Sequence, residues 1–591
     1  MSEENDKSED VLAYTQRNEF TSEIFKIEVR NLGIFGVWEL KKLIKNTLNL
    51  DASKIKSPNR RDFAFVCFRN QEDQEKAISV LNGYKWKGKV LAAMSAKASA
   101  DPLIKRRNEG NQRQDDQPKR QKTSVEATCP LAGLPYKDQI EQKRSEMENL
   151  LKSFGKELIK FNPDAKKTCF PVNSDLPCKF LGIKESPIVD GYRNKSEFTV
   201  GKNSQGEIVV GFRLGSYADG SVEVCTVADL PHVSDLAKKA AITFQEYVRQ
   251  SKFLPFNPEH NAGHFRQVTV RTSDETGEVM LVAGVYSSNL TEEEIPQLKK
   301  ELVDFYENYD KLVFNCSSLY YQDLRRRQAG ETYNPVEHLA GSTHITDVIL
   351  GLRFRISPLA FFQINSKGAE VLYKEAIDLI AATEKTTVLD ICCGTGTIAL
   401  SFAKHCKKVL GVEIIEDAIK DAEFNAKENA IENCKFYAGN ADDYIQSMVR
   451  EVVYGAGIHK DQLDLVAIVD PPRAGLHNKS IAAIRSAYDL KRLVYISCNP
   501  KSAQRNWLDL ARTESKQYKG SPFYPTKAVA VDMFPHTAHT EMAILFERNV
   551  EKEVPEVVQK QVEVKEVVKM EVEGKKDETE TKDETVVGEG S

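Results

Sequence analysis

The sequence predicts a multidomain α/β protein with three folded parts. These are a small ferredoxin-like α+β domain (23–97), a mixed α+β central domain (127–350) and a Rossmann-like domain (351–550). The first observation is length, because 591 residues exceed what a single core usually holds. The second is a polar, basic stretch (98–126) without apolar periodicity, which predicts a linker. The third is the alternation of short apolar runs with helical segments after residue 351, which predicts a parallel sheet covered on both faces.

The two ends of the chain are predicted to be disordered. Residues 1–22 are polar, and residues 551–591 carry 13 Asp/Glu and 7 Lys/Arg but no aromatic residue. The net charge of -5 argues against a uniformly basic nucleic-acid coat. No stretch of 18 or more apolar residues occurs, so no membrane span is expected. The acidic start is unlike a secretory or mitochondrial leader, and we therefore expect the cytosol, the nucleus or both.

Cysteine usage bears on disulfides and metals. The eleven cysteines are scattered along the chain and include no Cys-x-x-Cys pair. This spacing favours neither a disulfide framework nor a structural metal site, and we expect no metal.

The N-terminal part shows the alternation of a small α/β domain. Apolar runs that end in turn-forming residues are separated by two segments of helical periodicity. The expected elements are a strand at Phe25–Val29, a helix at Val37–Thr47, a strand at Phe63–Phe68, a helix at Gln71–Leu81 and a strand at Lys89–Ser95.

The third of these elements carries a motif. Residues Arg61–Phe68 match the RNA-recognition-motif signature at all but one position, because Asp62 replaces a glycine. Phe63 and Phe65 share one face of a strand, where RNA bases could stack. The partner strand has Glu28 where an aromatic residue is usual, and a carboxylate there would repel phosphate. The motif predicts the fold, with RNA contact through the two phenylalanines as the main interpretation and protein contact as the alternative.

Two basic clusters lie in the linker, at Lys105–Arg107 and Lys119–Lys122. Their spacing resembles a bipartite nuclear-import signal. A solvated charged linker would show the same composition, so both interpretations stay open.

The central region mixes helical and strand-like segments. It is predicted to begin with a helix at Tyr136–Lys160 and to continue mainly as short strands. The strands are expected at Glu197–Val200, Ile208–Phe212, Val268–Arg271 and Val279–Val285.

The C-terminal region begins with a helix at Ser366–Ala382, whose apolar residues form one stripe. Short apolar runs follow and are separated mostly by helical segments. The predicted strands are Thr387–Ile391, Val409–Glu413, Cys434–Ala438, Leu465–Asp470, Arg492–Ser497, Val529–Phe534 and Met542–Phe546.

The loop Asp390–Thr397 joins the first of these strands to a helix. Gly394 and Gly396 permit a tight turn and a close approach of a ligand to the backbone. Glu413 ends the next strand about 20 residues later, where an acid can bind ribose hydroxyls. Ala399 stands at the third glycine position of a dinucleotide fingerprint, and a P-loop lysine is missing. The loop therefore favours S-adenosyl-L-methionine over NAD or ATP.

Two further polar segments follow strands of the same predicted sheet. Asn440 follows Cys434–Ala438, where an adenine contact is expected. Asp470 begins the run Asp-Pro-Pro-Arg at the carboxyl end of the fourth strand, the edge at which open α/β sheets bind ligands.

Cys498 and Glu541 predict covalent chemistry. Cys498 follows a strand and precedes Asn499-Pro500, and Glu541 closes the segment His-Thr-Glu. Carbon 5 of a pyrimidine becomes nucleophilic only after a thiolate adds at carbon 6. A base must then remove the carbon-5 proton so that the thiol can leave. Apolar neighbours of Glu541 could raise its pKa and suit it to this role.

This ordered set of motifs resembles the RNA uracil-5 methyltransferases over residues 190–547. The chain lacks the cysteine cluster that holds an iron–sulfur centre in rRNA-modifying members, and this departure implies tRNA, specifically its T-loop uridine, as the substrate. The motifs that carry the resemblance are Tyr192–Phe198, Phe361–Asn365, Asp390–Gly394, Asp470–Arg473, Ser497–Pro500 and His539–Glu541.

The resemblance also implies residue roles. Cys498 would be the nucleophile and Glu541 the proton acceptor, and Arg193 and Lys195 of the substrate-side segment would contact RNA. An aromatic residue is common in some relatives where this chain has Cys392, so that contact to the cofactor is in doubt. The residues implied for S-adenosyl-L-methionine are Gln363, Glu413, Asn440 and Asp470, with Gly394 and Thr397 near its methionine part.

Two alternatives remain open on the sequence. An RNA cytosine-5 methyltransferase uses similar covalent chemistry, but such enzymes usually carry a cysteine directly after Asp-Pro-Pro, where this chain has Arg473. A catalytically silent RNA-binding scaffold could retain the same fold. An intact Cys498, Glu541 and cofactor loop argue against the scaffold.

Overall fold

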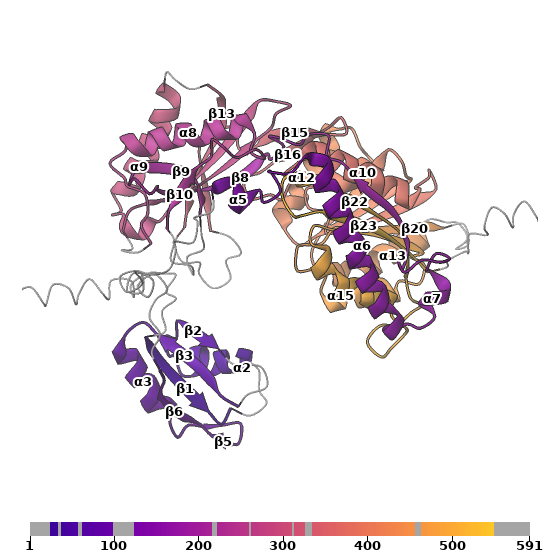
Figure 1. Ribbon diagram of the computed structural model, residues 1–591, viewed down its shortest axis with the longest axis horizontal. Coiled ribbons are helices and arrows are strands. Elements are labelled where there is room, and N and C mark those ends of the chain that lie inside the picture. The colour runs from indigo at the N-terminus through magenta and orange to yellow at the C-terminus, as the bar shows by residue number, and fades with distance from the viewer. Residues whose placement is uncertain are drawn as a thin grey trace, which may run out of the picture.

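The computed structural model (Figure 1) describes nine stretches of the chain. The predicted disordered ends, both basic linker clusters and Arg61 lie outside them. No helix within these stretches is long and apolar enough to cross a membrane. The stretches are 24–32, 37–56, 62–97, 123–214, 222–258, 262–309, 313–324, 334–455 and 463–548.

The N-terminal domain is a four-stranded antiparallel sheet in the order β2-β3-β1-β6. Its core cluster draws only on residues of this domain, including the fully buried Ile27, Val66 and Leu81. A domain with its own core can fold as a unit, and the predicted RNA-recognition-motif fold is confirmed. The elements are β1 (Phe25–Arg30), α2 (Val37–Lys42) running into a π-helical turn (Leu43–Thr47), β2 (Lys54–Lys56), β3 (Ala64–Phe68), α3 (Gln71–Leu81), β4 (Lys85–Trp86), β5 (Lys89–Val90) and β6 (Ala92–Ser95).

The central domain is a seven-stranded sheet in the order β10-β9-β8-β11-β12-β13-β14. Apolar side chains of its strands and of the amphipathic helices α8 and α9 form one core. The mixed α+β prediction holds, and each predicted strand lies within an observed one. The elements are β8 (Lys195–Lys202), β9 (Ile208–Arg213), β10 (Val224–Thr226), α8 (Asp235–Gln250), β11 (Phe265–Thr272), β12 (Glu278–Val285), α9 (Glu294–Asn308), β13 (Asn315–Asp323) and β14 (Val336–Gly341).

The C-terminal domain is an eight-stranded sheet in the order β19-β18-β17-β20-β21-β23-β22-β7. The five strands from β19 to β21 run parallel, whereas β23 is antiparallel to both of its neighbours. The expectation of a wholly parallel sheet is therefore wrong at this end. The short connection from β22 to β23 leaves no room for the helix that a parallel crossover needs.

Helices cover both faces of this sheet (Figure 1), and the side chains of its strands are mostly apolar and buried. The elements are β15 (Ile345–Ile349), β16 (Leu352–Ile356), α10 (Ser366–Ile380), β17 (Thr386–Ile391), α11 (Thr397–Ala403), β18 (Lys408–Glu413), α12 (Glu416–Glu428), β19 (Cys434–Ala438), α13 (Ala441–Gly455), β20 (Asp464–Val469), α14 (Asn478–Ser486), β21 (Arg492–Ser497), α15 (Pro500–Ala511), β22 (Tyr524–Val531) and β23 (Glu541–Glu547).

The domain boundary near residue 127 differs from the expected one. Helix α6 (Tyr136–Phe161) packs on α15 of the C-terminal domain, where Phe154 meets the Trp507 ring at 5.5 Å. Strand β7 (Lys179–Lys184) pairs with β22 and forms the edge of the C-terminal sheet. Residues 136–184 thus share the core of a sheet that begins about 200 residues later. The short helices α5 (Ser124–Thr128) and α7 (Ala165–Thr168) flank α6.

The strand order reverses beside β17. The chain runs from β17 outward to β18 and β19 and then returns to β20 on the other side of β17. Helices therefore diverge at the carboxyl ends of β17 and β20 and leave a crevice between them. The predicted cofactor and catalytic residues lie around this edge of the sheet.

Candidate active site

The antiparallel pairing of β21 and β23 brings Cys498 and Glu541 together. Their register places Ser497 opposite Met542. Continuing it by one residue puts Cys498, just past the end of β21, opposite Glu541, the first residue of β23. The structure thereby brings together two residues that are more than forty positions apart in the chain.

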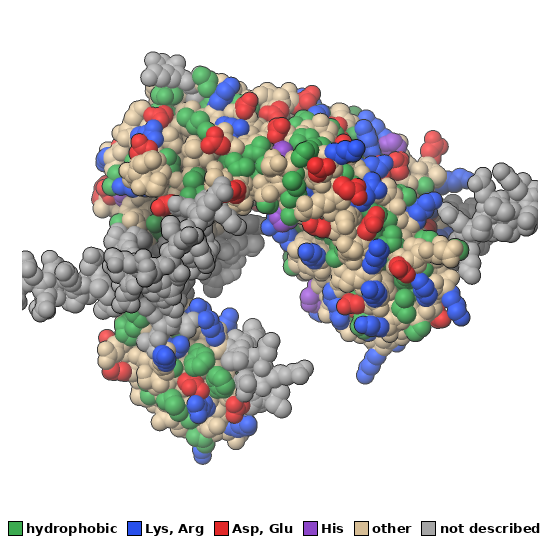
Figure 2. Space-filling model, in the orientation of Figure 1, with side chains coloured by type: hydrophobic (Ala, Val, Ile, Leu, Met, Phe, Trp, Pro, Cys, Tyr) green, Lys and Arg blue, Asp and Glu red, His purple; other side chains and the backbone are tan. Residues whose placement is uncertain are grey.

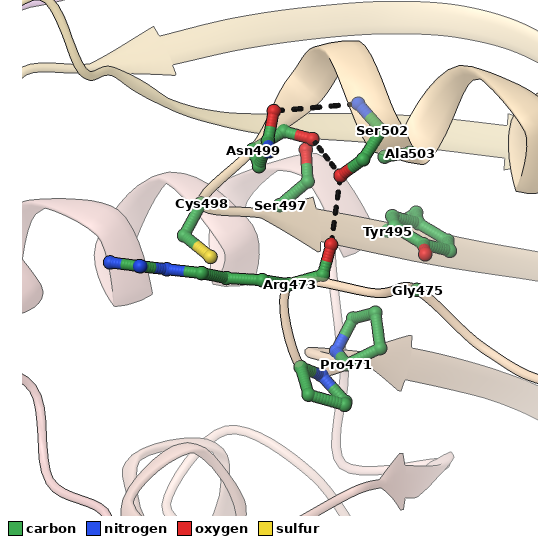
Figure 3. Close-up of a pocket in the computed structure, with 10 residues that line it drawn as sticks. Pro471, Arg473, Gly475, Tyr495, Ser497, Cys498, Asn499, Ser502 and Ala503 are labelled. Atoms are coloured by element: carbon green, nitrogen blue, oxygen red, sulfur yellow. Dashed lines mark hydrogen bonds between the residues drawn. The ribbon is translucent and has the colours of Figure 1, made fainter. Parts of the chain in front are cut away.

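Cys498 lines a small open pocket beyond the end of β21. Burial raises the pKa of its thiol to about 11, and the carboxyls of Glu541 and Asp470 act in the same direction. Arg473 acts in the opposite direction, and its side chain passes beside the Cys498 sulfur (Figure 3). The backbone carbonyl of Arg473 accepts a hydrogen bond of 2.8 Å from Ser502 Oγ, which holds this loop against α15.

Two acidic side chains, Asp470 and Glu541, act on the thiol. Glu541 is 2 % exposed, and its Oε2 atom has no hydrogen-bond partner. Burial raises the pKa of Glu541 well above its ordinary value, and Asp470 adds to the rise. Burial likewise raises the pKa of Asp470. Two carboxyls that raise the cost of each other's charge do not both ionise readily, so the pair can hold and exchange a proton.

The cofactor loop has the backbone that its glycines predicted. Gly394 and Gly396 lie at φ values of 55° and 80°, and a Cβ atom built on Gly394 meets nothing within 4 Å. Open space above a left-handed glycine lets a ligand approach the main chain. The Gly394 amide donates to Glu413 Oε2 over 3.3 Å, which ties the loop to the end of β18. These features fit S-adenosyl-L-methionine.

The other predicted cofactor residues come from different segments of the chain. Gln363 is buried, and its main-chain carbonyl accepts a hydrogen bond of 2.9 Å from Asn194 Nδ2. Asn440 is exposed just past β19, and Thr397 begins α11 and hydrogen-bonds the Tyr373 hydroxyl over 3.1 Å. Contact of these side chains with a cofactor stays a prediction.

The predicted RNA contacts fall into two separate places. Lys195 begins β8 and Arg193 precedes it by two residues, and the positive charge of Arg473 in the catalytic loop adds to the lowering of the Arg193 pKa. Phe65 lies on β3 of the N-terminal domain, and Phe63 directly precedes that strand, with the two rings 5.5 Å apart. The first pair thus adjoins the active site, and the second belongs to another domain.

Asp390 and Arg473 were not predicted as functional side chains. Asp390 is fully buried at the end of β17, and neither carboxyl oxygen has a hydrogen-bond partner. Burial raises its pKa to about 8, and Asp470 contributes. An aspartate inside an otherwise apolar strand was a signal in the sequence, because such a charge rarely lies in a core without a role. Among the described residues, no group of three or more potential ligands could hold a metal ion.

Comparisons with known proteins place the chain in a family. Residues 342–549 match the family model of tRNA (Uracil-5-)-methyltransferase, and residues 49–92 match the RNA recognition motif. The chain is 39% identical to the tRNA (uracil-5-)-methyltransferase homolog A of Mus musculus, over 91% of this chain and 86% of that protein. The human homolog A is 38% identical over 91% of this chain and 84% of its own length.

A solved structure shows a more distant likeness. The Pyrococcus abyssi tRNA (uracil-54, C5)-methyltransferase in complex with S-adenosyl-L-homocysteine is 21% identical to this chain, with a TM-score of 0.48. That match covers 78% of this chain and 91% of the archaeal one.

Identity at this level over nine-tenths of the chain confirms the predicted family. It also confirms the prediction of an enzyme that methylates RNA with S-adenosyl-L-methionine as its cofactor. With its added N-terminal RNA-recognition motif, the sequence also resembles the eukaryotic homolog A within this family, and the identities of 39% and 38% confirm this likeness. The chain belongs to the tRNA (uracil-5-)-methyltransferase family.

Proposed function

We propose that the protein methylates carbon 5 of the T-loop uridine of tRNA through a covalent bond between Cys498 and carbon 6 of the uracil. The observation that carries the proposal is the pairing of β21 with β23, which places a thiol opposite a buried carboxyl. Both groups adjoin Asp470 at the crevice that fits the cofactor. The names of the relatives support tRNA as the substrate.

The reaction has three steps. The Cys498 thiolate forms a bond to carbon 6, and the electron pair of the carbon 5–carbon 6 double bond makes carbon 5 nucleophilic. S-adenosyl-L-methionine supplies the methyl group that carbon 5 then takes up. Glu541 removes the carbon-5 proton, the double bond re-forms, and the bond from sulfur to carbon 6 breaks.

The electrostatics of the site suit the two residues to different tasks. The raised pKa of Cys498 keeps the thiol protonated before RNA binds, and the Arg473 guanidinium favours the thiolate. The raised pKa of Glu541 makes its carboxylate a stronger base than an exposed glutamate. An acidic partner at Asp470 offers a place for the proton that Glu541 takes.

Trapping with 5-fluorouridine tests the covalent mechanism. Fluorine at carbon 5 prevents the final proton removal, so the bond between enzyme and RNA should survive denaturation. We expect an adduct between the wild-type protein and tRNA that carries 5-fluorouridine in its T loop, and none with Cys498→Ala. With unmodified tRNA, Glu541→Gln should accumulate the methylated adduct.

The outcomes separate the proposal from its alternatives. An adduct with 5-fluorocytidine only would indicate cytosine-5 methylation. RNA binding without either adduct would indicate a scaffold. Loss of activity in Glu541→Gln without any adduct would contradict the role of Glu541 as the base.

A further inference from the structure

A row of cations lies on one face of the central sheet, close to the active site. Lys195 of β8 stands directly opposite Arg271 of β11 in the strand register. Arg193 precedes Lys195 by two residues, and side chains at this spacing project from the same face of an extended chain. Like charges directly opposite each other destabilise a sheet unless an opposite charge is present.

The counter-charges near this row leave some of its donors without a hydrogen-bond partner. Two carboxylates, Asp347 and Glu197, act on Arg271 and favour its charged form. Glu197 lies 4.0 Å from Lys195, and its side chain is 62% exposed. Arg271 is 2% exposed and donates from Nη2 to the Ala360 carbonyl over 2.8 Å, but its Nη1 atom has no partner. The buried Nε atom of Arg193 has none either. Unpartnered buried donors of this kind point to an anion that the row is built to receive.

The row continues to the nucleophile. Burial lowers the pKa of Arg193, and the positive charge of Arg473 acts in the same direction. Arg473 is exposed and passes beside Cys498, as Figure 3 shows. An anion held between Arg193 and Arg473 would therefore lie next to the base that Cys498 attacks.

Charge is mixed on the face of the molecule that Figure 2 shows. Over the face of the central and C-terminal domains in Figure 2, acidic and basic side chains are interspersed. The whole chain is slightly acidic, with a net charge of -5. A local cluster, rather than a broad basic field, then has to position the RNA backbone at the site.

We propose that Arg193, Lys195, Arg271 and Arg473, here named the phosphate cradle, bind one of the two RNA phosphates that flank the target uridine. A nucleotide's own phosphate lies one sugar away from its base, which matches a cradle that starts beside the nucleophile. Lys195 and Arg473 reach the phosphate from the rim, and the deeply buried Arg271 adds positive charge behind them. The contact reads the backbone and positions any uridine presented there, without regard to base sequence. This inference rests on the proposed function, because it assumes an RNA uridine at Cys498.

A coupling experiment tests the cradle. The probe is a T-arm RNA hairpin in which one phosphate at a time is replaced by an uncharged methylphosphonate. Its affinity is measured without cofactor for the wild-type protein, Lys195→Met, Lys195→Arg and Lys202→Met. Lys202 is the matched control, because it is an exposed lysine at the far end of the same strand.

We expect Lys195→Met to weaken binding of the unmodified hairpin and to flatten its salt dependence by about 0.7–0.9 in log–log slope, the loss of one phosphate contact. A methylphosphonate at one flanking position should weaken RNA binding by the wild-type protein to a similar degree. The same methylphosphonate should not weaken RNA binding by Lys195→Met any further. Lys195→Arg should keep the coupling, and Lys202→Met should behave as wild type.

The phosphate cradle would be contradicted if the losses of RNA affinity from Lys195→Met and from the methylphosphonate add at both flanking positions. An equal loss of RNA affinity in Lys202→Met would also contradict it. Loss of coupling in Lys195→Arg as well would indicate a packing role and would also overturn it. The 5-fluorouridine adduct of the wild-type protein is scored separately. If this adduct does not form, the proposed function is contradicted. If the adduct forms but the losses of affinity are additive, only the phosphate cradle is contradicted.

Discussion

At the scale of single residues, Asp390 is an acidic group that is held away from water. It is fully buried at the end of β17, and both carboxyl oxygens lack a hydrogen-bond partner. Its pKa of about 8 in the folded protein lies far above that of an unfolded aspartate. The folded state therefore binds a proton that the unfolded state has released, and folding loses stability as pH rises from about 4 to about 8.

This linkage predicts the behaviour of Asp390→Asn. The substitution removes a carboxyl that is costly to ionise, so the ligand-free variant should be more stable than wild type at pH 8 by roughly 1–3 kcal/mol. The advantage should shrink toward pH 4, where both states of the wild type are protonated. Thermal unfolding of the C-terminal domain between pH 5 and pH 9 measures it. A stability difference that does not change with pH would contradict the explanation.

Some residues of the site could be predicted from the sequence and others could not. The positions of Cys498, Glu541 and the glycine loop were predictable because their chemistry is tied to short motifs. The opposition of Lys195 and Arg271 was not predictable, because the register between β8 and β11 depends on pairing across about 75 residues of chain. Arg473 was noticed for the cysteine it replaces, whereas its place beside the thiol follows only from how its loop folds.

At the scale of elements, α6 links the start of the catalytic domain to the segment before Glu541. Lys143 of α6 donates to Asp532 Oδ1 over 2.6 Å and to the Phe534 carbonyl over 3.0 Å. Both side chains of this ion pair are almost completely buried. Gln139, one turn earlier, accepts a hydrogen bond of 2.9 Å from the His536 amide. The helix thereby holds the chain that leads into β23.

Removing one partner of a buried ion pair leaves the other charge uncompensated. Lys143→Met should therefore destabilise the catalytic domain by about 3–5 kcal/mol. Urea unfolding followed by amide hydrogen exchange in α6 measures the loss. Lys152→Met, an exposed lysine on the same helix, is the control and should change stability little.

A second variant checks the cause. Asp532→Asn in the Lys143→Met background removes the unpaired charge and should recover part of the lost stability. If the double variant is no more stable than Lys143→Met alone, lost packing rather than uncompensated charge explains the effect.

Helix α6 could be predicted from the sequence, but the surface on which it packs could not. The apolar periodicity of α6 predicted a helix at Tyr136–Lys160, within one residue of its observed end. Periodicity identifies the buried face of a helix but not the surface that covers it. The partner, α15, lies more than 300 residues away in the chain. Strand β7 escaped prediction for a related reason, since it completes a sheet whose other strands all follow residue 385.

At the scale of the whole molecule, the N-terminal domain has its own core and an outward sheet face suited to RNA. Glu28, which the sequence suggested would repel phosphate, pairs with Arg30 Nε at 2.9 Å. Its cross-strand neighbours on the two sides are Phe65 and the half-exposed Met94. Lys26 Nζ lies 5.1 Å from the centre of the Phe65 ring. The face therefore combines rings for stacking with cations for phosphate.

Replacing Phe63 and Phe65 together by alanine in the full chain tests this face. Each lost stack should weaken RNA binding by roughly 1–3 kcal/mol. The methylation rate at saturating tRNA should stay near that of wild type, because Cys498 and Glu541 belong to a different domain. Val80→Ala, an exposed apolar change on helix α3 of the same domain, is the control. Unchanged tRNA affinity in the double variant would indicate that this sheet binds protein rather than RNA, whereas a slower chemical step with unchanged affinity would mean that the domain helps to present the uridine to Cys498.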